Sequence, residues 1–194
     1  MAGEDDTRGD RAGHEGTLDP DRRFVIVPER RPPLDAEQII SLIERQVGAV
    51  GETNEHLIAN ARPADLLEAL AAASEPRVRQ IICDICGFAG AQEALPALVA
   101  ALDDPSAGVR SSAADAIGKL GASRSEADGE LEAAGVALLR RLHAESDPGI
   151  RRAMAVGLSG VRYEPALPAM REAAEHDELM QRIVEHATGF MGVA

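Results

Sequence analysis

Apolar residues recur with the period of an α-helix along most of the chain. In the segment ALPALVAAL, Leu95, Leu98 and Leu102 lie at i, i+3 and i+7, which places them on one face of a helix. Similar amphipathic segments are ADLLEALAAA, AAGVALLRRLHA and ALPAMREAA. Each of the four is followed by a second amphipathic segment, so the pattern predicts successive pairs of helices.

The second helix of each predicted pair repeats in sequence. Its first apolar position, the anchor, is occupied in turn by Val78, Val109, Ile150 and Met180. The residues four, eight and eleven positions after each anchor fall on one helical face and are mostly apolar or small. A unit of about 30 residues cannot bury its apolar face alone and is stable only when stacked on its neighbours. The sequence therefore predicts an all-α fold, an α-solenoid over residues 35–194.

Polar residues stand where several of these helices are expected to begin. Asp35 and Gln38 have the spacing of a capping box, which predicts a helix from Ala36. Thr53 is positioned to cap a short helix after it, so that residues 35–61 would form a partial pair. In three of the repeats the residue three positions before the anchor is a strong N-cap. These residues are Ser106, Asp147 and Asp177.

Glycine is expected to end the second helices. Twelve residues after the anchors the chain has Gly90, Gly121 and Gly192, with Arg162 in the remaining unit. Between the anchors Val109 and Ile150 the chain contains an insert, ASRSEADGELEA, which we expect to bulge as an acidic loop.

Residues 1–34 differ from the rest of the chain in composition. They are rich in Gly, Asp, Arg and Pro and cannot bury enough apolar surface to order themselves, so we expect a disordered N-terminal tail. Within it, Phe24–Val27 concentrates four apolar residues. This stretch is either a docking segment, for this domain or for a partner, or a chance apolar patch. The expected organisation is this tail followed by one solenoid domain.

Composition and charge narrow the classes of function. The 194 residues carry a net charge of -13 and include no Trp, one Tyr and three Phe. Nucleic-acid binding is not expected, because it depends on clustered cations and aromatic stacking. No segment reaches the roughly 20 apolar residues that span a bilayer, and the acidic start of the chain does not resemble a secretory signal. We expect a cytoplasmic protein that does not contact the membrane.

Cys83 and Cys86 form a C-x-x-C pair inside a predicted helix. No second cysteine pair exists to complete a zinc site, and a redox pair is expected at a strand-to-helix turn, so we predict two buried small side chains. His56, His176 and His186 each follow Glu, but they lack the number and facing positions of a di-metal site. With no phosphate loop or nucleophile motif, we predict no metal, no cofactor, no catalytic residue and no enzymatic activity.

The string ALPALVAALDDPSAGVRSSAADAIGKLG resembles the HEAT repeat, in particular the bacterial subgroup similar to the phycobilisome-lyase type of HEAT-like repeats. The matching residues are the Asp-Pro turn, the aliphatic-Arg pair and the terminal Leu-Gly. The resemblance implies a right-handed stack of HEAT-like helix pairs whose second helices line a concave, protein-binding face. The last unit departs from it, with Gln181 in place of Arg and an apolar FMGVA end. We expect that end to be covered by a second copy of this chain, by another partner or by the tail.

An Arg follows the anchor in three units, and two interpretations are open for these side chains and their neighbours. Arg79, Arg110 and Arg151 are expected to pair with turn acids of adjoining units. The turn acids considered are Asp103, Asp104, Asp147 and Asp177. Arg152 and Arg182 are expected to present positive charge to carboxylates or phosphates of a partner. The candidate partner-binding residues are Arg152, Arg182, Arg79, Asp84, Asp115, Glu185 and His186.

Together these patterns predict a non-catalytic scaffold or adaptor that holds a partner protein on the concave face of the solenoid. The alternative is an auxiliary subunit of a modifying enzyme, bilin-lyase-like or other, in which another chain performs the catalysis.

Overall fold

The computed structural model of the protein describes residues 33–45, 50–125 and 128–192. The chain divides into residues 1–32 and 33–194, and the fold described below is that of the second unit. The predicted tail, with its docking segment Phe24–Val27, lies outside the described residues except for positions 33 and 34.

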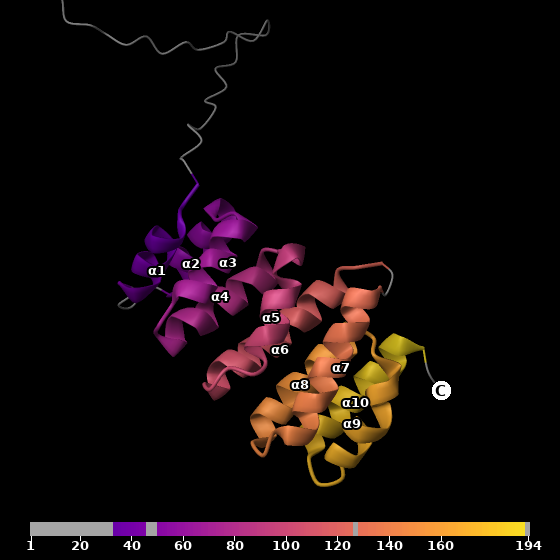
Figure 1. The fold of residues 1–194 in the computed structure, drawn as a ribbon. Helices are drawn as coiled ribbons and strands as arrows, with labels where there is room; N and C mark the ends of the chain where they lie inside the picture. Colours follow the sequence, from indigo (N-terminus) through magenta and orange to yellow (C-terminus); the bar gives the residue numbers. More distant parts are fainter. Residues whose placement is uncertain (1–32, 46–49, 126–127, 193–194) are drawn as a thin grey trace, which may run out of the picture. The chain divides into compact units, whose positions relative to one another are not determined.

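The secondary structure of the described residues is helical. In addition, Leu34 forms an isolated parallel β-bridge with Ala61. The helices follow one another as successive layers (Figure 1). They are α1 (Ala36–Glu44), α2 (Val50–Asn60), α3 (Pro63–Ala72), α4 (Pro76–Phe88), the 3-10 helix η1 (Gln92–Ala94), α5 (Leu95–Ala101), α6 (Ala107–Ala122), α7 (Gly129–Ala144), α8 (Pro148–Gly160), the 3-10 helix η2 (Glu164–Ala166), α9 (Leu167–Ala173) and α10 (Glu178–Met191).

The helices pack as the repeated units predict. The pairs are α3 with α4, α5 with α6, α7 with α8, and α9 with α10. The second helices α4, α6, α8 and α10 also pack on one another in that order and form one continuous layer (Figure 1). This arrangement confirms the predicted all-α solenoid of stacked helix pairs. None of the helices in the described part is long and apolar enough to cross a membrane.

Three of the expected capping residues fix the starts of their helices. The Asp35 carboxylate accepts a bond of 2.8 Å from the Gln38 backbone N–H, and the Gln38 side chain accepts one of 3.1 Å from the Asp35 N–H. This reciprocal pair confirms the capping box of α1. Asp147 and Asp177 cap α8 and α10 through their side chains. Ser106 occupies the N-cap of α6, but its hydroxyl makes no capping bond.

Two predicted boundaries are wrong. Helix α2 begins at Val50, so Thr53 lies inside it rather than at its cap. Gly90 and Gly192 adopt the left-handed backbone, with φ of 65° and 70°, and do end their helices, but Gly121 lies within α6. A Cβ at Gly121 would come 2.8 Å from the Cα of Val161, so this glycine serves close helix packing rather than helix termination.

Half of the insert between the central units, Ala122 and residues 129–133, is helical. Both α6 and α7 have 16 residues, and α7 begins at Gly129, within the segment expected to bulge. Asp128 caps α7 by accepting bonds from the backbone N–H groups of Glu130 and Leu131. Arg124 pairs with Asp128 and Glu130 at 2.6 and 3.1 Å. The predicted acidic loop is therefore reduced to the short connection between the two helices.

The core consists of Leu, Ile, Val, Ala and Met side chains along the seam between the helix layers. Cys83 and Cys86 are fully buried and unpaired on α4, as predicted for small apolar side chains. Burial raises the pKa of each thiol to about 12, so both remain protonated at neutral pH.

Helices α6 and α8 approach each other most closely through glycine. A Cβ at Gly118 would lie 3.1 Å from the Cα of Gly157, and one at Gly157 would lie 2.8 Å from the carbonyl oxygen of Ala114. At Gly160 an added Cβ would overlap the backbone of Gly118. The backbones of the two central second helices are thus in direct contact, which no larger residue at these positions permits.

We predict that Gly160→Ala destabilises the solenoid by about 2 kcal/mol, because the new methyl group must push α6 and α8 apart. Gly189→Ala is the matched control, since Gly189 in α10 has open space around its Cα. The control should be neutral or more stable by up to about 1 kcal/mol, because alanine favours the helix over glycine. Urea unfolding followed by circular dichroism measures both. Equal stability of Gly160→Ala and wild type would contradict the close contact.

Candidate functional site

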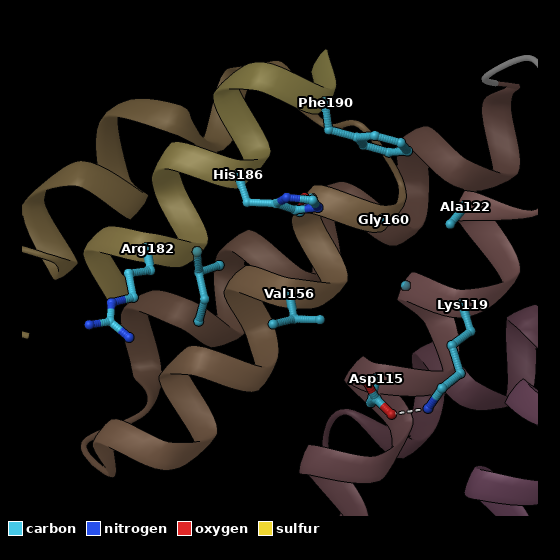
Figure 2. A pocket seen from close by; sticks show the side chains of 11 residues that line it. Asp115, Lys119, Ala122, Val156, Gly160, Arg182, His186 and Phe190 are labelled. Atoms are coloured by element: carbon cyan, nitrogen blue, oxygen red, sulfur yellow. Dashed lines mark hydrogen bonds and ion pairs between the residues drawn. The ribbon is translucent and has the colours of Figure 1, made fainter. Parts of the chain in front are cut away.

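A groove of about 480 Å³ opens on the layer of second helices, across α6, α8 and α10 (Figure 2). Its apolar lining comes chiefly from Val156 of α8 and from Ile183 and Phe190 of α10. Val156 and Phe190 are 40% and 45% exposed, which is high for large apolar side chains in a folded chain. The remaining residues of its lining are Asp115, Gly118, Lys119, Ala122, Ser159, Gly160, Arg182 and His186.

The groove exists because α10 carries two apolar stripes. Met180, Val184 and Ala187 form the first stripe and are buried against the preceding unit. The second stripe, at i, i+4, i+7 and i+11, lies beside the first; Ile183 in it packs in part on the core, and its other members are exposed. It consists of Leu179, Ile183, His186 and Phe190. Since α10 is the last described helix, no later unit of the described chain packs against this second stripe.

Aromatic and charged side chains meet at the two rims of the groove. The rings of His186 and Phe190 stack with centroids 6.2 Å apart, and the guanidinium of Arg162 lies 5.0 Å from the Phe190 ring. Lys119 pairs with Asp115, and its ammonium lies 4.2 Å above the ring of Phe88, which is 64% exposed. Cations over ring faces are favourable contacts, so they help to hold these exposed aromatic rings in place.

Residues 63–134 match the family model for HEAT repeats. The chain contains HEAT repeats. Its structure is also similar to the solved complex of CpcE and CpcF of phycocyanin lyase from Nostoc sp. PCC7120, with a TM-score of 0.59, 19% sequence identity, and coverage of 84% of this chain and 67% of that chain. Both findings confirm the resemblance stated from the sequence, and the structural likeness extends the fold beyond the matched repeats. No curated protein sequence matches the chain significantly.

Three of the predicted partner-binding residues line the groove of the HEAT solenoid. Asp115 and His186 lie at its two rims, and Arg182 is exposed beside Ile183 (Figure 2). Arg182 makes no ion pair with any of the described residues.

Two others lie outside the groove. Asp84 is half-buried on α4, where burial raises the pKa of its carboxyl and a hydrogen bond with Ser112 opposes that rise. Glu185 is exposed on α10 and lines a separate small hollow with Arg171 and Gln181. The described part of the solenoid contains no cluster of three His, Cys, Asp or Glu side chains able to hold a metal ion. The assignment of these residues to partner binding stays a prediction.

The remaining two candidates are engaged within the chain. Arg79 donates two hydrogen bonds to the Asp104 carboxylate, at 2.8 and 3.1 Å, and others to the carbonyl groups that precede α4. Arg152 donates from Nε to the Asp177 carboxylate at 2.9 Å. A partner would have to compete with these ion pairs, so both guanidiniums have a structural role whatever else they bind.

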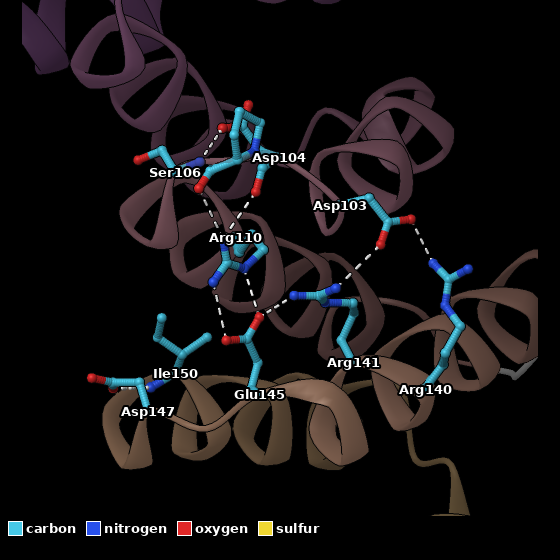
Figure 3. Close-up of polar contacts among 10 residues, drawn as sticks. Asp103, Asp104, Ser106, Arg110, Arg140, Arg141, Glu145, Asp147 and Ile150 are labelled. Atoms are coloured by element: carbon cyan, nitrogen blue, oxygen red, sulfur yellow. Dashed lines mark hydrogen bonds and ion pairs between the residues drawn. The ribbon is translucent and has the colours of Figure 1, made fainter.

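Arg110 joins neighbouring HEAT repeats as its position after the anchor predicts (Figure 3). It donates to both oxygens of Glu145, at 2.6 and 3.0 Å, and to the carbonyl oxygens of Asp104 and Pro105. Arg141 also binds Glu145, whose side chain is only 5% exposed. These cations hold the pKa of Glu145 below its usual range, with the Arg110 hydrogen bond as the main cause.

The acidic partners differ in part from those considered. Asp104 pairs with Arg79 as expected, whereas Asp147 caps α8 through the Ile150 N–H and Arg110 pairs with Glu145 instead. Arg151 makes no ion pair in the described part of the chain, and its buried Nε has no hydrogen-bond partner, so the expected bracing contact is missing there.

The sequence alone did not identify the acid that completes the Arg110 contact or the exposed Phe88, Val156 and Leu179, although it did single out the apolar end that contains Phe190. Asp104 and Glu145 each stand five residues before the next anchor, a regularity that could have identified both. The second stripe of α10 was visible as a helical spacing, but the apolar face of an isolated helix does not reveal which neighbour covers it. Phe88 and Val156 carried no such signal, because their exposure depends on how the layers stack.

We predict that the folded protein becomes less stable as the pH is lowered, because these carboxylates become protonated. Arg79, Arg110 and Arg152 lower the pKa values of Asp104, Glu145 and Asp177 respectively. A carboxyl whose pKa is lower in the folded state stabilises the fold above its unfolded pKa, about 4, and loses this contribution as pH falls further. The urea midpoint should therefore be nearly constant from about pH 7 to 5 and then decrease.

Glu145→Gln tests the most buried of these contacts. Removing one partner of a nearly buried pair should cost about 3 kcal/mol at neutral pH and should flatten the decrease in acid. Glu130→Gln is the control, because Glu130 is 63% exposed in its pair with Arg124 and should change stability little. Equal urea midpoints for the two variants at neutral pH would show that Glu145 does not brace the repeats.

Proposed function

We propose that this protein is a non-catalytic scaffold or adaptor that holds a partner protein on the groove of its second-helix layer. The observation that carries the proposal is the exposed apolar lining between α8 and α10, in an otherwise acidic chain. Apolar side chains exposed together and rimmed by polar groups are typical of surfaces that another molecule covers.

The position of the exposed residues supports this choice. The large apolar side chains that are exposed in the described part are Phe88, Val136, Val156, Leu179 and Phe190. Four of them belong to second helices, and Val136 belongs to α7. A groove built from several repeats can follow an extended partner surface, which is how solenoids commonly bind.

A second candidate function is that of an auxiliary subunit of a modifying enzyme, with catalysis by another chain. The observation that favours it is the similarity in fold to the complex of CpcE and CpcF of phycocyanin lyase. That structure is a complex of two proteins, so it also agrees with a protein partner here. Because fold alone does not transfer activity, a lyase-like role for this chain rests on the experiment below.

Val156→Gln should weaken capture of the native partner at least about tenfold, because it places an amide in the apolar part of the groove without changing the charge. Val136→Gln is the matched control: Val136 is 52% exposed but does not line the groove, so its replacement should leave capture unchanged. The measurement is affinity purification of the tagged chain from the native host, with mass spectrometry of the bound proteins.

Circular dichroism melting verifies that both variants are folded. Equal recovery of the same partner by Val156→Gln and wild type would contradict binding in the groove. A catalytic chain or a chromophore that co-purifies with the partner would favour the auxiliary-subunit function over a plain adaptor.

A further inference from the structure

The groove has the shape of a seat for one helix. The second stripe of α10 runs from Leu179 to Phe190, a distance of about 17 Å along the helix axis, or about three turns, and its part from Ile183 onward lines the groove. Opposite it, the walls from α6 and α8 combine Val156 and the polar residues named above with the small residues Gly118, Ala122 and Gly160. Small side chains beside larger apolar ones leave room for a helix to pack closely.

An extended strand is a poorer occupant of the same groove. The backbone groups of α6, α8 and α10 are already bonded within their own helices, so they offer no row of free N–H and C=O groups to a strand. A helix satisfies its own backbone and needs only side-chain contacts, as in other helix-in-groove complexes.

The charges at the groove favour an acidic partner, although the chain as a whole is acidic. The lining holds the cations Lys119 and Arg182 but a single carboxylate, Asp115, which is paired with Lys119. Arg182 is exposed and without an ion pair in the described part of the chain. The exposed carboxylates Glu178 and Glu185 lie four and three residues from Arg182 on α10 but outside the lining, so the preference for an acidic partner rests on the cations within the groove itself.

We propose that this groove binds an amphipathic α-helix of about three turns whose apolar stripe packs on Val156, Ile183 and Phe190 and whose flanking carboxylates pair with Arg182. The proposal rests on the proposed function and specifies the chemistry of the partner. Leu179 extends the apolar stripe beyond the groove, so the helix lies along α10.

Synthetic helix-forming peptides of about 16 residues test this proposal. Three peptides share leucines at i, i+3, i+4 and i+7 on an alanine background and differ in their flanking positions, which are Glu, Lys or Gln. Fluorescence anisotropy with the full chain measures their affinities. The Glu peptide should bind at least about tenfold more tightly than the Lys peptide, and its binding should weaken as salt is raised to about 0.5 M.

Two variants locate the interaction. Arg182→Glu should reverse the preference between the Glu and Lys peptides. Arg171 is exposed on α9 and lies outside the groove, so Arg171→Glu should not reverse it. Val156→Gln should weaken all three peptides, and Val136→Gln none.

Equal or tighter binding of the Lys peptide to the wild-type chain would overturn the proposal. If all peptides bind alike and Val156→Gln weakens them alike, the groove binds apolar helices and the acidic specificity is wrong. If no peptide binds, the helix proposal is wrong, and the capture of a native partner still tests the scaffold function independently.

Discussion

The contact between α6 and α8 is the constraint on which the rest of the solenoid depends. Their backbones touch through Gly118, Gly157 and Gly160, so the spacing of the second helices there is set by the backbone itself. At these glycines no side chain separates α6 from α8. Ala122 of α6 and Val156 of α8 are thereby brought to the two sides of the groove. The small residues thus determine both the packing of the core and the width of the surface above it.

Ion pairs between repeats complement this apolar packing. Arg79 and Arg110 each reach across to a carboxylate of the next unit and also bind carbonyl oxygens of the turn before their own helix. Each guanidinium therefore ties two successive turns together at the N-terminal ends of the second helices. At the junction between α8 and the last described unit the pattern changes, because Arg152 rather than Arg151 pairs with the turn acid Asp177.

Helix α10 is the last second helix of the described stack. Helices α6 and α8 each lie between two second helices, whereas α10 has α8 on one side and no later described helix on the other. Leu179 and Phe190 of α10 are exposed, Ile183 packs in part on the core, and Arg182 has no acid of a following described turn to pair with. The exposed apolar residues and the cation at this end of the described stack are the combination that the proposed acidic helix would bind.

The sequence by itself determined the features that depend on neighbours in the chain. Helix periodicity, the Asp35 capping box and the glycines at 90 and 192 are set by contacts within a few residues, and the repeat of the anchors then implied stacking. Burial of the two cysteines was predicted from the lack of a second cysteine pair and from the usual burial of a free cysteine, and both are buried.

Only the tertiary structure decided the features that join distant segments. Gly121 lies inside α6, where Val161, 40 residues later, packs against it, and Arg110 meets Glu145 rather than Asp147 of the same turn. The exposure of Val156 and of the second stripe of α10 likewise depends on which helices lie beside them. The physical reason is that local periodicity places a side chain on a helix face, whereas the stacking of the layers determines what that face contacts.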